Sequence, residues 1–167
     1  MTEIWDVYDE NAQKTGRTMK RGEPLPGDFM LYVVVYLYHP SGKFLKQKRS
    51  MTKQTHPGEW DITGGAVLSG EESIYAAIRE TEEEIGVRLS ESDLRYIGRY
   101  KKKNRFAELY FAIKDFDVDK CILQESEVSE VKLVTPDELF RMESEKRKPE
   151  YMQMIRGFIT NELLQWA

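Results

Sequence analysis

Apolar and polar residues are distributed along the chain in runs that predict several strands. The continuous apolar and aromatic run Phe29–Tyr38 has the length of a central strand that is covered on both faces of its sheet. After a His-Pro-Ser-Gly turn, Lys43–Arg49 predicts a second strand. Leu94–Tyr100 and Phe106–Ile113 predict two more, and a short strand is expected at Val131–Val134. The pattern therefore favours a protein that is built around a sheet.

The stretch Gly65–Val87 predicts a loop that runs into an amphipathic helix. Ser69 is the expected N-cap, Glu72 follows three residues later as in a capping box, and Gly86 is the expected left-handed stop. Residues that face the core repeat at steps of three and four, as on one face of a helix. This stripe comprises Ile74, Ala77, Ile78, Thr81 and Ile85.

Two further helices are predicted towards the end of the chain. Thr135 is an N-cap that is followed by proline, and Glu138 completes its capping box. The last helix, at about Pro149–Trp166 (149–166), has an apolar face that packs on the rest of the domain or on a partner subunit. This face comprises Met152, Ile155, Phe158, Ile159 and Leu163.

Residues 1–27 are expected to form an arm before the first long strand. Ile4–Tyr8 is strand-like, and Lys14–Met19 is expected to pair back on it as a small hairpin. Alternating strands and helices of these lengths predict an α/β (α+β) fold in which a mixed sheet is sandwiched between helices. With 167 residues, the chain is expected to form one domain over 1–167.

Composition narrows the classes of function. A net charge of −4 provides no basic footprint, so no nucleic-acid polymer is expected as a partner. The only cysteine, Cys121, falls in a segment that we interpret as a buried strand; a single cysteine excludes an internal disulfide framework and fits a reducing compartment. No apolar run approaches the roughly 20 residues of a membrane span, and the acidic N-terminus does not read as a signal peptide. We therefore expect a soluble, cytoplasmic protein without a membrane partner.

Three carboxylates lie on one side of the helix predicted in Gly65–Val87. At 3.6 residues per turn, Glu80, Glu83 and Glu84 fall within roughly 100° of one another. Like charges at this spacing repel each other and weaken an isolated helix, and a bound cation removes that penalty. Carboxylate clusters suit hard, oxygen-seeking ions, so Mg²⁺ or Mn²⁺ is the expected cofactor. The alternative is an acidic helix face that is merely solvated.

The spacing of charged residues and glycines around these carboxylates resembles the signature of the Nudix hydrolases. The matching positions are Gly65, Glu71, Arg79, Glu80, Glu83, Glu84, Gly86 and Val87. Thr81 departs from the pattern, in which the residue after Arg-Glu is aliphatic, but its methyl group can still pack on the stripe. The stretches EIWDVYDENAQKTGR and RGEPLPGDF resemble the N-terminal arm of the Nudix subgroup related to isopentenyl-diphosphate isomerase. The family resemblance implies the same sandwiched mixed sheet.

The resemblance also implies a set of metal ligands. Glu80, Glu83 and Glu84 match the ligands that the family places on the helix, and the carbonyl of Gly64 would be a further ligand. Glu71 matches the first glutamate of the motif, which supports the site through its charge and hydrogen bonds.

Arg79 matches the motif arginine, which orients the carboxylates through a salt bridge. The general base is a helix glutamate in some relatives, which would be Glu80 here, and a glutamate on a later loop in others. Glu127 best fits that loop position, and the neighbouring Glu125 and Glu130 stay open as alternatives.

The function that the resemblance implies is divalent-metal-dependent hydrolysis of the diphosphate linkage in a nucleoside diphosphate joined to another moiety. Arg49 ends a strand where the family often has an arginine near the substrate, and a salt bridge at the rim is the alternative. Specificity is expected from residues 50–59, 99–106 and 114–126 together with the arm. The basic tip Lys101–Arg105 either reaches substrate phosphates or is a solvated edge. A homodimer is common in the family.

Two other functions compete with hydrolysis. A diphosphate isomerase related to isopentenyl-diphosphate isomerase is suggested by the arm, but it needs a cysteine near Trp60–Gly65, where this chain has none. A non-catalytic, nucleotide-sensing Nudix domain typically loses carboxylates of the motif, whereas this chain retains them.

Overall fold

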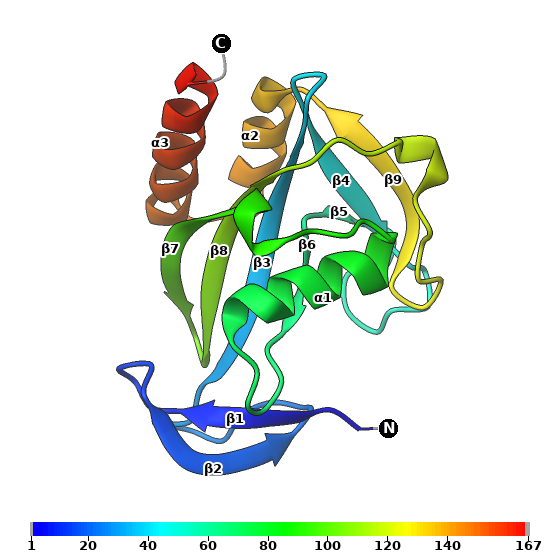
Figure 1. Cartoon of the computed structure of the whole chain (residues 1–167). Coiled ribbons are helices and arrows are strands. Elements are labelled where there is room, and N and C mark those ends of the chain that lie inside the picture. Colours follow the sequence, from blue (N-terminus) through cyan, green and yellow to red (C-terminus); the bar gives the residue numbers. More distant parts are fainter. Residues whose placement is uncertain (1, 166–167) are drawn as a thin grey trace.

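The structure is a computed structural model that describes residues 2–165 and contains two sheets. The smaller sheet is a hairpin of β1 (Ile4–Tyr8) and β2 (Lys14–Lys20), which lies at one end of the molecule (Figure 1). The larger sheet has seven strands: β3 (Met30–His39), β4 (Lys43–Arg49), β5 (Trp60–Asp61), β6 (Thr63–Ala66), β7 (Leu94–Lys102), β8 (Arg105–Ile113) and β9 (Val128–Val134). The helices are α1 (Ser73–Ile85), α2 (Pro136–Ser144) and α3 (Pro149–Gln165), with short 3₁₀ turns at Glu91–Asp93 and Val118–Lys120.

Strand β3 is central in the larger sheet. It pairs in parallel with β8 along its length and in antiparallel fashion with β6 on its other edge. It meets β4 only beside the turn, where Tyr38 lies opposite Phe44, because β4 pairs mainly with β5 and β9. Strands β3 and β4 therefore separate beyond the turn, and β6 brings the backbone of Gly64 and Gly65 into the space between them.

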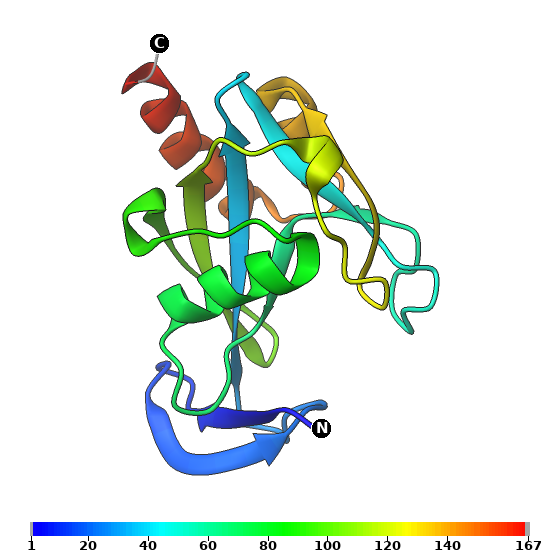
Figure 2. The same cartoon turned by 45° about the vertical axis from the view of Figure 1, so that its right-hand side comes forward.

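Helices cover both faces of this sheet, with α1 on one side and α2 and α3 on the other (Figures 1 and 2). The period of two along β3 explains the division of the core. Val33 and Val35 pack in the cluster beneath α1, whereas Val34 and Tyr36 pack in the cluster beneath α2 and α3. The predicted mixed sheet sandwiched between helices is confirmed. None of the helices in residues 2–165 is long and apolar enough to cross a membrane.

Several predicted elements are confirmed. Strand β4 has the predicted bounds, and Thr135 caps α2 through a capping box in which its hydroxyl accepts the N–H of Glu138 at 3.2 Å. Strand β9 begins at Val128, three residues before its predicted start, because those residues pair with the end of β4. Helix α3 begins at Pro149 as predicted, and its predicted end at Trp166 lies outside the described residues. The prediction of one domain over 1–167 stays a prediction.

The predicted N-cap of α1 is wrong. The helix begins at Ser73 after Glu72, whose side chain makes no capping hydrogen bond. Ser69 lies in the preceding turn instead, where its hydroxyl donates to Asp6 Oδ1 at 2.8 Å and thereby holds the turn against β1. The predicted stop is confirmed, since Gly86 has a φ of 73° and its N–H donates to the carbonyl of Glu82 at 2.9 Å.

The predicted hairpin of the arm is also confirmed, and it is joined to the larger sheet by backbone hydrogen bonds. Tyr8 N–H donates to the carbonyl of Phe29 at 2.8 Å, and Phe29 N–H donates back at 2.9 Å. Together with the contact between Asp6 and Ser69, these bonds place β1 beside the loop that leads into α1.

Candidate functional site

A cleft of about 860 Å³ opens where β3 and β4 separate. Its walls come from several parts of the chain: the arm, strands β3 to β6 with the loop 53–59, helix α1, the tip between β7 and β8, and the segments 124–127 and 146–147. The five residues predicted as metal ligands or as the best candidates for the base all line it, namely Gly64, Glu80, Glu83, Glu84 and Glu127.

Glu80 and Glu84 are the two buried carboxylates of α1 that reach this cleft. They are only 8% and 6% exposed, whereas Glu83, one turn away, is exposed. Glu80 lies directly against Gly65, since a Cβ added there would meet its carboxylate at far less than the 3.0 Å limit that real Cβ atoms respect. The absence of a side chain at Gly65 therefore makes room for this carboxylate.

The carboxylate of Glu84 is held by the strands behind it. Its Oε1 accepts the backbone N–H of Gly64 at 3.1 Å, and its Oε2 accepts Nε2 of Gln47 at 3.0 Å. The amide of Gln47 is fixed in turn, because Thr63 donates to its Oε1 at 2.8 Å. The backbone of Gly64 in β6 and the side chain of Gln47 in β4 thus orient the same carboxylate.

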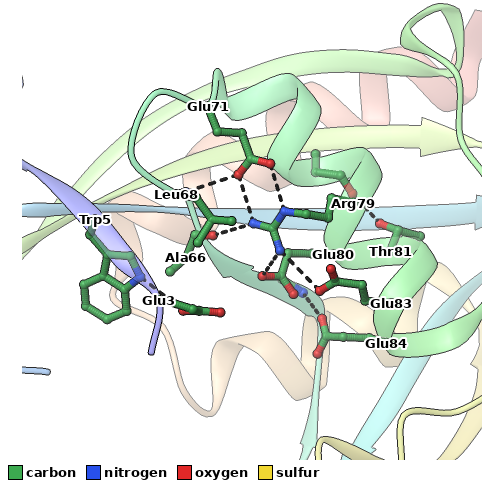
Figure 3. Close-up of polar contacts among 12 residues, drawn as sticks. Glu3, Trp5, Ala66, Leu68, Glu71, Arg79, Glu80, Thr81, Glu83 and Glu84 are labelled. Carbon is green, nitrogen blue, oxygen red and sulfur yellow. Dashed lines mark hydrogen bonds and ion pairs between the residues drawn. The ribbon is translucent and has the colours of Figure 1, made fainter. Parts of the chain in front are cut away.

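Arg79 links four groups of the motif, as Figure 3 shows. It binds both oxygens of Glu71, with Nε–Oε2 at 2.8 Å and Nη2–Oε1 at 2.9 Å. Its Nη1 also donates to Glu80 Oε1 at 3.0 Å and to Glu83 Oε2 at 3.2 Å. Its Nη2 donates to the carbonyl of Ala66 at 3.0 Å, which ties α1 to β6. The guanidinium is therefore placed to orient carboxylates, as the resemblance implies for this position.

Burial and like charges raise the pKa values of the two buried carboxylates. Burial raises the pKa of Glu80 to about 7; Arg79 opposes this, and the charges of Glu83 and Glu3 add to it. Burial and the neighbouring charge of Glu80 raise the pKa of Glu84 to about 8. Arg79 is paired with Glu80 but not with Glu84, so the negative charge of the two carboxylates is only partly compensated and the site is electrostatically suited to a cation.

The donor set fits a hard divalent ion, although it is not a closed cage. Within residues 2–165, no group of three His, Cys, Asp or Glu side chains is arranged to hold a metal. Glu83 differs from the other two helix carboxylates because it is exposed, and its Oε2 is paired with Arg79. Mg²⁺ commonly uses one or two carboxylates and takes its other ligands from water and substrate phosphates, which is what Glu80 and Glu84 beside an open cleft provide.

Of the three glutamates considered for the loop position, the structure brings only Glu127 to the cleft. Glu125 and Glu130 are exposed and are not among the lining residues. The carboxylate of Glu127 forms a close ion pair with Lys53, so that two loops meet across the cleft. Sequence analysis did not single out Lys53, because it lies in a polar loop whose course the local pattern does not define.

Arg49 lines the cleft, as expected for a residue near the substrate. Its guanidinium donates to the carbonyl of Thr55 at 3.1 Å and to the hydroxyl of the same residue at 3.2 Å. The alternative that we considered, a salt bridge at the rim, does not form with any described residue. Arg49 instead holds the loop 50–59 in place while it faces the cleft.

The arm supplies lining residues that sequence analysis missed. Glu3, which precedes β1, and Trp5 of β1 both line the cleft, and Figure 3 shows Glu3 between Trp5 and the helix carboxylates. The indole of Trp5 donates to Glu3 Oε2 at 3.1 Å. Of the loops expected to set specificity, 50–59 contributes four lining residues and 99–106 contributes four. The third, 114–126, contributes only Gln124. No local signal could have ranked these segments, because their approach depends on how the sheets pack.

The assignment of Cys121 to a buried strand is wrong. It follows the 3₁₀ turn Val118–Lys120, is half-buried, and packs at the margin of the core cluster beneath α1. It is not among the residues that line the cleft. The segment is irregular because the chain here leaves the sheet, and the N–H of Ile122 donates to the carbonyl at the end of α1.

Comparison with known proteins agrees with the geometry. The family model described as "NUDIX domain" matches residues 28–156. An uncharacterised Nudix hydrolase of Listeria monocytogenes is 37% identical over 144 residues, which is 85% of this chain and 85% of that protein. Nudix hydrolase 3 of Arabidopsis thaliana is 32% identical over 165 residues, covering 90% of this chain and 21% of that longer protein. A crystal structure from Deinococcus radiodurans superposes with a TM-score of 0.71 at 24% identity, over 92% of this chain and 98% of that one.

Proposed function

Because the chain belongs to the Nudix family and is a Nudix hydrolase, we propose a substrate of the kind that the cleft can hold. This substrate is a nucleoside diphosphate joined to another moiety, and the enzyme cleaves it at the diphosphate linkage. The observation that carries this proposal is the cleft itself. Two buried carboxylates and a bare glycine backbone form one part of its wall, and lysine and arginine side chains form others. A diphosphate needs both, because its anionic oxygens require positive charge and its attacking water requires activation.

Nudix enzymes typically use a divalent metal, and we propose Mg²⁺ or Mn²⁺ here. Glu80, Glu84 and the carbonyl of Gly64 would hold it, and Glu83 would join them after release from Arg79. When bound, such an ion neutralises charge on phosphate oxygens and acidifies water. Glu71 and Arg79 keep the carboxylates in position through their paired hydrogen bonds.

The proton of the attacking water needs an acceptor, for which we propose Glu80. Its Oε1 is bound by Arg79, while its Oε2 accepts no hydrogen bond from a described residue and lies at the cleft. Glu127 is the competing acceptor, and it would first have to leave Lys53. Arg49 would contact the substrate from the rim of the cleft.

The test of the reaction class is release of phosphate or nucleotide from dinucleoside polyphosphates, sugar nucleotides and nucleoside triphosphates, with Mg²⁺, with Mn²⁺ and with chelator. Glu84→Gln should abolish metal-dependent turnover, by itself and together with Glu83→Gln. Glu82→Gln is the matched control, because Glu82 is exposed on the same helix and pairs with Arg88 outside the cleft. Turnover that survives both Glu84→Gln and chelator would refute the proposed chemistry.

The choice of base is tested separately by pH–rate profiles of Glu80→Gln and Glu127→Gln. If Glu80 accepts the proton, its variant loses the acid limb of the profile, whereas Glu127→Gln keeps the limb at a lower rate. The reverse result would transfer the role to Glu127.

Three finer predictions accompany this proposal. We propose that the chain belongs to the subgroup related to isopentenyl-diphosphate isomerase, and the resemblance of the arm alone supports this. We do not propose isomerase activity, because none of the described residues that line the cleft is a cysteine. A cytoplasmic location and a homodimer also stay predictions. Light scattering of the purified protein would measure its oligomeric state.

A further inference from the structure

A second, smaller cavity of about 110 Å³ adjoins the cleft at its end away from α1. Four residues line both spaces, so the cavity is an extension of the cleft: Tyr32, Lys102, Lys146 and Arg147. The remaining lining residues are Tyr100, Lys148 and Tyr151. This cationic pocket, as we name these seven residues, joins the tip between β7 and β8 to the connection between α2 and α3.

The pocket is built on a fixed arginine. The guanidinium of Arg147 donates to Glu143 Oε2 at 3.1 Å and pairs with Asp61 at 3.5 Å, and it stacks over the ring of Tyr151 at 5.0 Å from the centroid. The ring of Tyr151 meets that of Tyr100 edge-on at 5.2 Å. These contacts hold the floor of the pocket in one arrangement, so a ligand would not have to order it.

The charges of the three lysines of the pocket are less fully neutralised by carboxylates than the charge of Arg147. Lys146 pairs with Glu59 at 3.8 Å and donates to the carbonyl of Trp60. Lys102 and Lys148 form no ion pair and no side-chain hydrogen bond with the described residues 2–165. Two lysines without counter-charges therefore line one small cavity.

Like charges crowd at this point. Burial lowers the pKa of Lys102, and the charges of Arg147, Arg105, Lys103 and Lys148 lower it further. Such a cluster repels itself, and an anion at its centre would remove the repulsion. The carboxylates of this region, Asp61 and Glu59, are already engaged with cations, which leaves the cluster net positive.

The size of the pocket limits what it can take. Pockets for whole small molecules usually occupy roughly 300–1,000 Å³, so a cavity of about 110 Å³ accommodates one group of a larger ligand. Rings of Tyr32, Tyr100 and Tyr151 line it, and the hydroxyl of Tyr151 is already engaged with that of Tyr36 at 2.6 Å. Hydrogen-bond donors remain on the lysines, and they match a compact anion with several acceptor oxygens.

We propose that the cationic pocket binds a second phosphoryl group of the substrate, at the end of the cleft remote from Glu80 and Glu84. This inference rests on the proposed function and deepens it. The substrate class becomes a nucleoside diphosphate conjugate that bears an additional phosphoryl group, supplied either by a phosphomonoester on the far moiety or by a longer polyphosphate chain. The basic tip Lys101–Arg105 was expected either to contact substrate phosphates or to be a solvated edge. Under this proposal it contacts the substrate through Lys102.

The first experiment measures binding of inorganic phosphate by calorimetry in chelator, at constant ionic strength. The test variant is Lys102→Ala with Lys148→Ala, which removes no ion pair and no side-chain hydrogen bond of the described fold. The matched control is Lys43→Ala with Lys120→Ala, two exposed lysines outside both cavities. Saturable binding that is weakened about tenfold or more only in the test variant supports the pocket. Absence of saturable binding, or equal weakening in the control, overturns it.

The second experiment compares kcat/KM for substrate pairs that differ in one phosphoryl group. NADH against NADPH tests a phosphomonoester, and a dinucleoside triphosphate against the tetraphosphate tests chain length. The wild type should prefer the member with the additional phosphate through a lower KM, and the preference should collapse in the Lys102→Ala, Lys148→Ala variant. An unchanged ratio in that variant refutes the pocket. Lack of turnover on every substrate, with phosphate binding intact, would refute the proposed function and leave the pocket standing.

Discussion

The two glycines of β6 offer a sharp test of how this site is built, because the same substitution should mainly lower stability at Gly64 and mainly lower activity at Gly65. A Cβ at Gly64 would meet the backbone carbonyl of Val33, whereas a Cβ at Gly65 would meet the carboxylate of Glu80. Both approaches are far below the 3.0 Å limit for Cβ atoms. The obstacle at Gly64 is paired backbone, which cannot move without breaking β3 from β6, and the obstacle at Gly65 is the end of a side chain.

The magnitudes follow from these two obstacles. Gly64→Ala overpacks a strand pair, so we expect a loss of about 2–3 kcal/mol in the free energy of unfolding, which lowers Tm by roughly 4–12 °C for a chain of this size. Gly65→Ala should cost no more than about 1 kcal/mol, because Glu80 can swing aside and loses mainly its contact with Arg79. A displacement of about 1 Å at a catalytic carboxylate is nevertheless expected to lower kcat roughly 100-fold.

The assay pairs thermal unfolding with metal-dependent hydrolysis of the best substrate. Gly157→Ala is the control, since Gly157 lies in helix α3 with no atom within 4 Å of an added Cβ. It should stabilise the protein by about 0.5–1 kcal/mol and leave the rate unchanged. If Gly65→Ala keeps full activity, Glu80 does not need its observed position. If Gly64→Ala is as stable as the wild type, the pairing of β6 with β3 does not need a glycine beside the carbonyl of Val33.

Three further predictions concern buried charge. Lys46→Met removes one partner of the fully buried ion pair with Glu143 and should lower the free energy of unfolding in urea by about 3 kcal/mol. The loss stays at this level because Arg147 still pairs with the carboxylate. A change below about 1 kcal/mol would contradict this. Burial raises the pKa of Glu143, but Arg147 and Lys46 outweigh burial and hold that pKa below its ordinary value of 4.5. The ionised Glu143 therefore contributes its full stability above about pH 4.5, and this contribution is lost as the pH falls. Glu143→Gln should therefore flatten the unfolding profile at low pH, and an unaltered slope there would assign acid sensitivity to other groups. In chelator, the raised pKa values of Glu80 and Glu84, about 7 and about 8, should make the free energy of unfolding fall as the pH rises from about 4.5 to 8, and Mg²⁺ should remove most of that fall. Equal profiles with and without Mg²⁺ would count against these carboxylates as ligands.

Local patterns predicted the elements well where the physical signal is itself local. The capping box of α2 and the left-handed stop at Gly86 depend on residues within one turn, and both are confirmed. The N-cap of α1 shows the limit of such reasoning. Ser69 has the right type and spacing, but Asp6, which is distant in sequence, accepts its hydroxyl and draws it out of the helix.

The same limit applies to the candidate site, in which only the features that depend on local spacing could be predicted. The helical period alone places Glu80, Glu83 and Glu84 on one side of α1, and the motif alone pairs Glu71 with Arg79. Neither could reveal that Gln47 holds Glu84, that Lys53 closes on Glu127, or that Arg147 reaches the far end of the cleft.

The sequence by itself determined the family signature, the carboxylate face of α1 and the order of strands and helices, because each is written in spacings of a few residues. Only the tertiary structure decided which carboxylates are buried, how the arm and the loops close around them, and where the positive charges gather. The reason is physical. Burial, ion pairing and pKa depend on groups that meet through the separation of β3 from β4 and the packing of α2 and α3, and those contacts join residues that no local spacing relates.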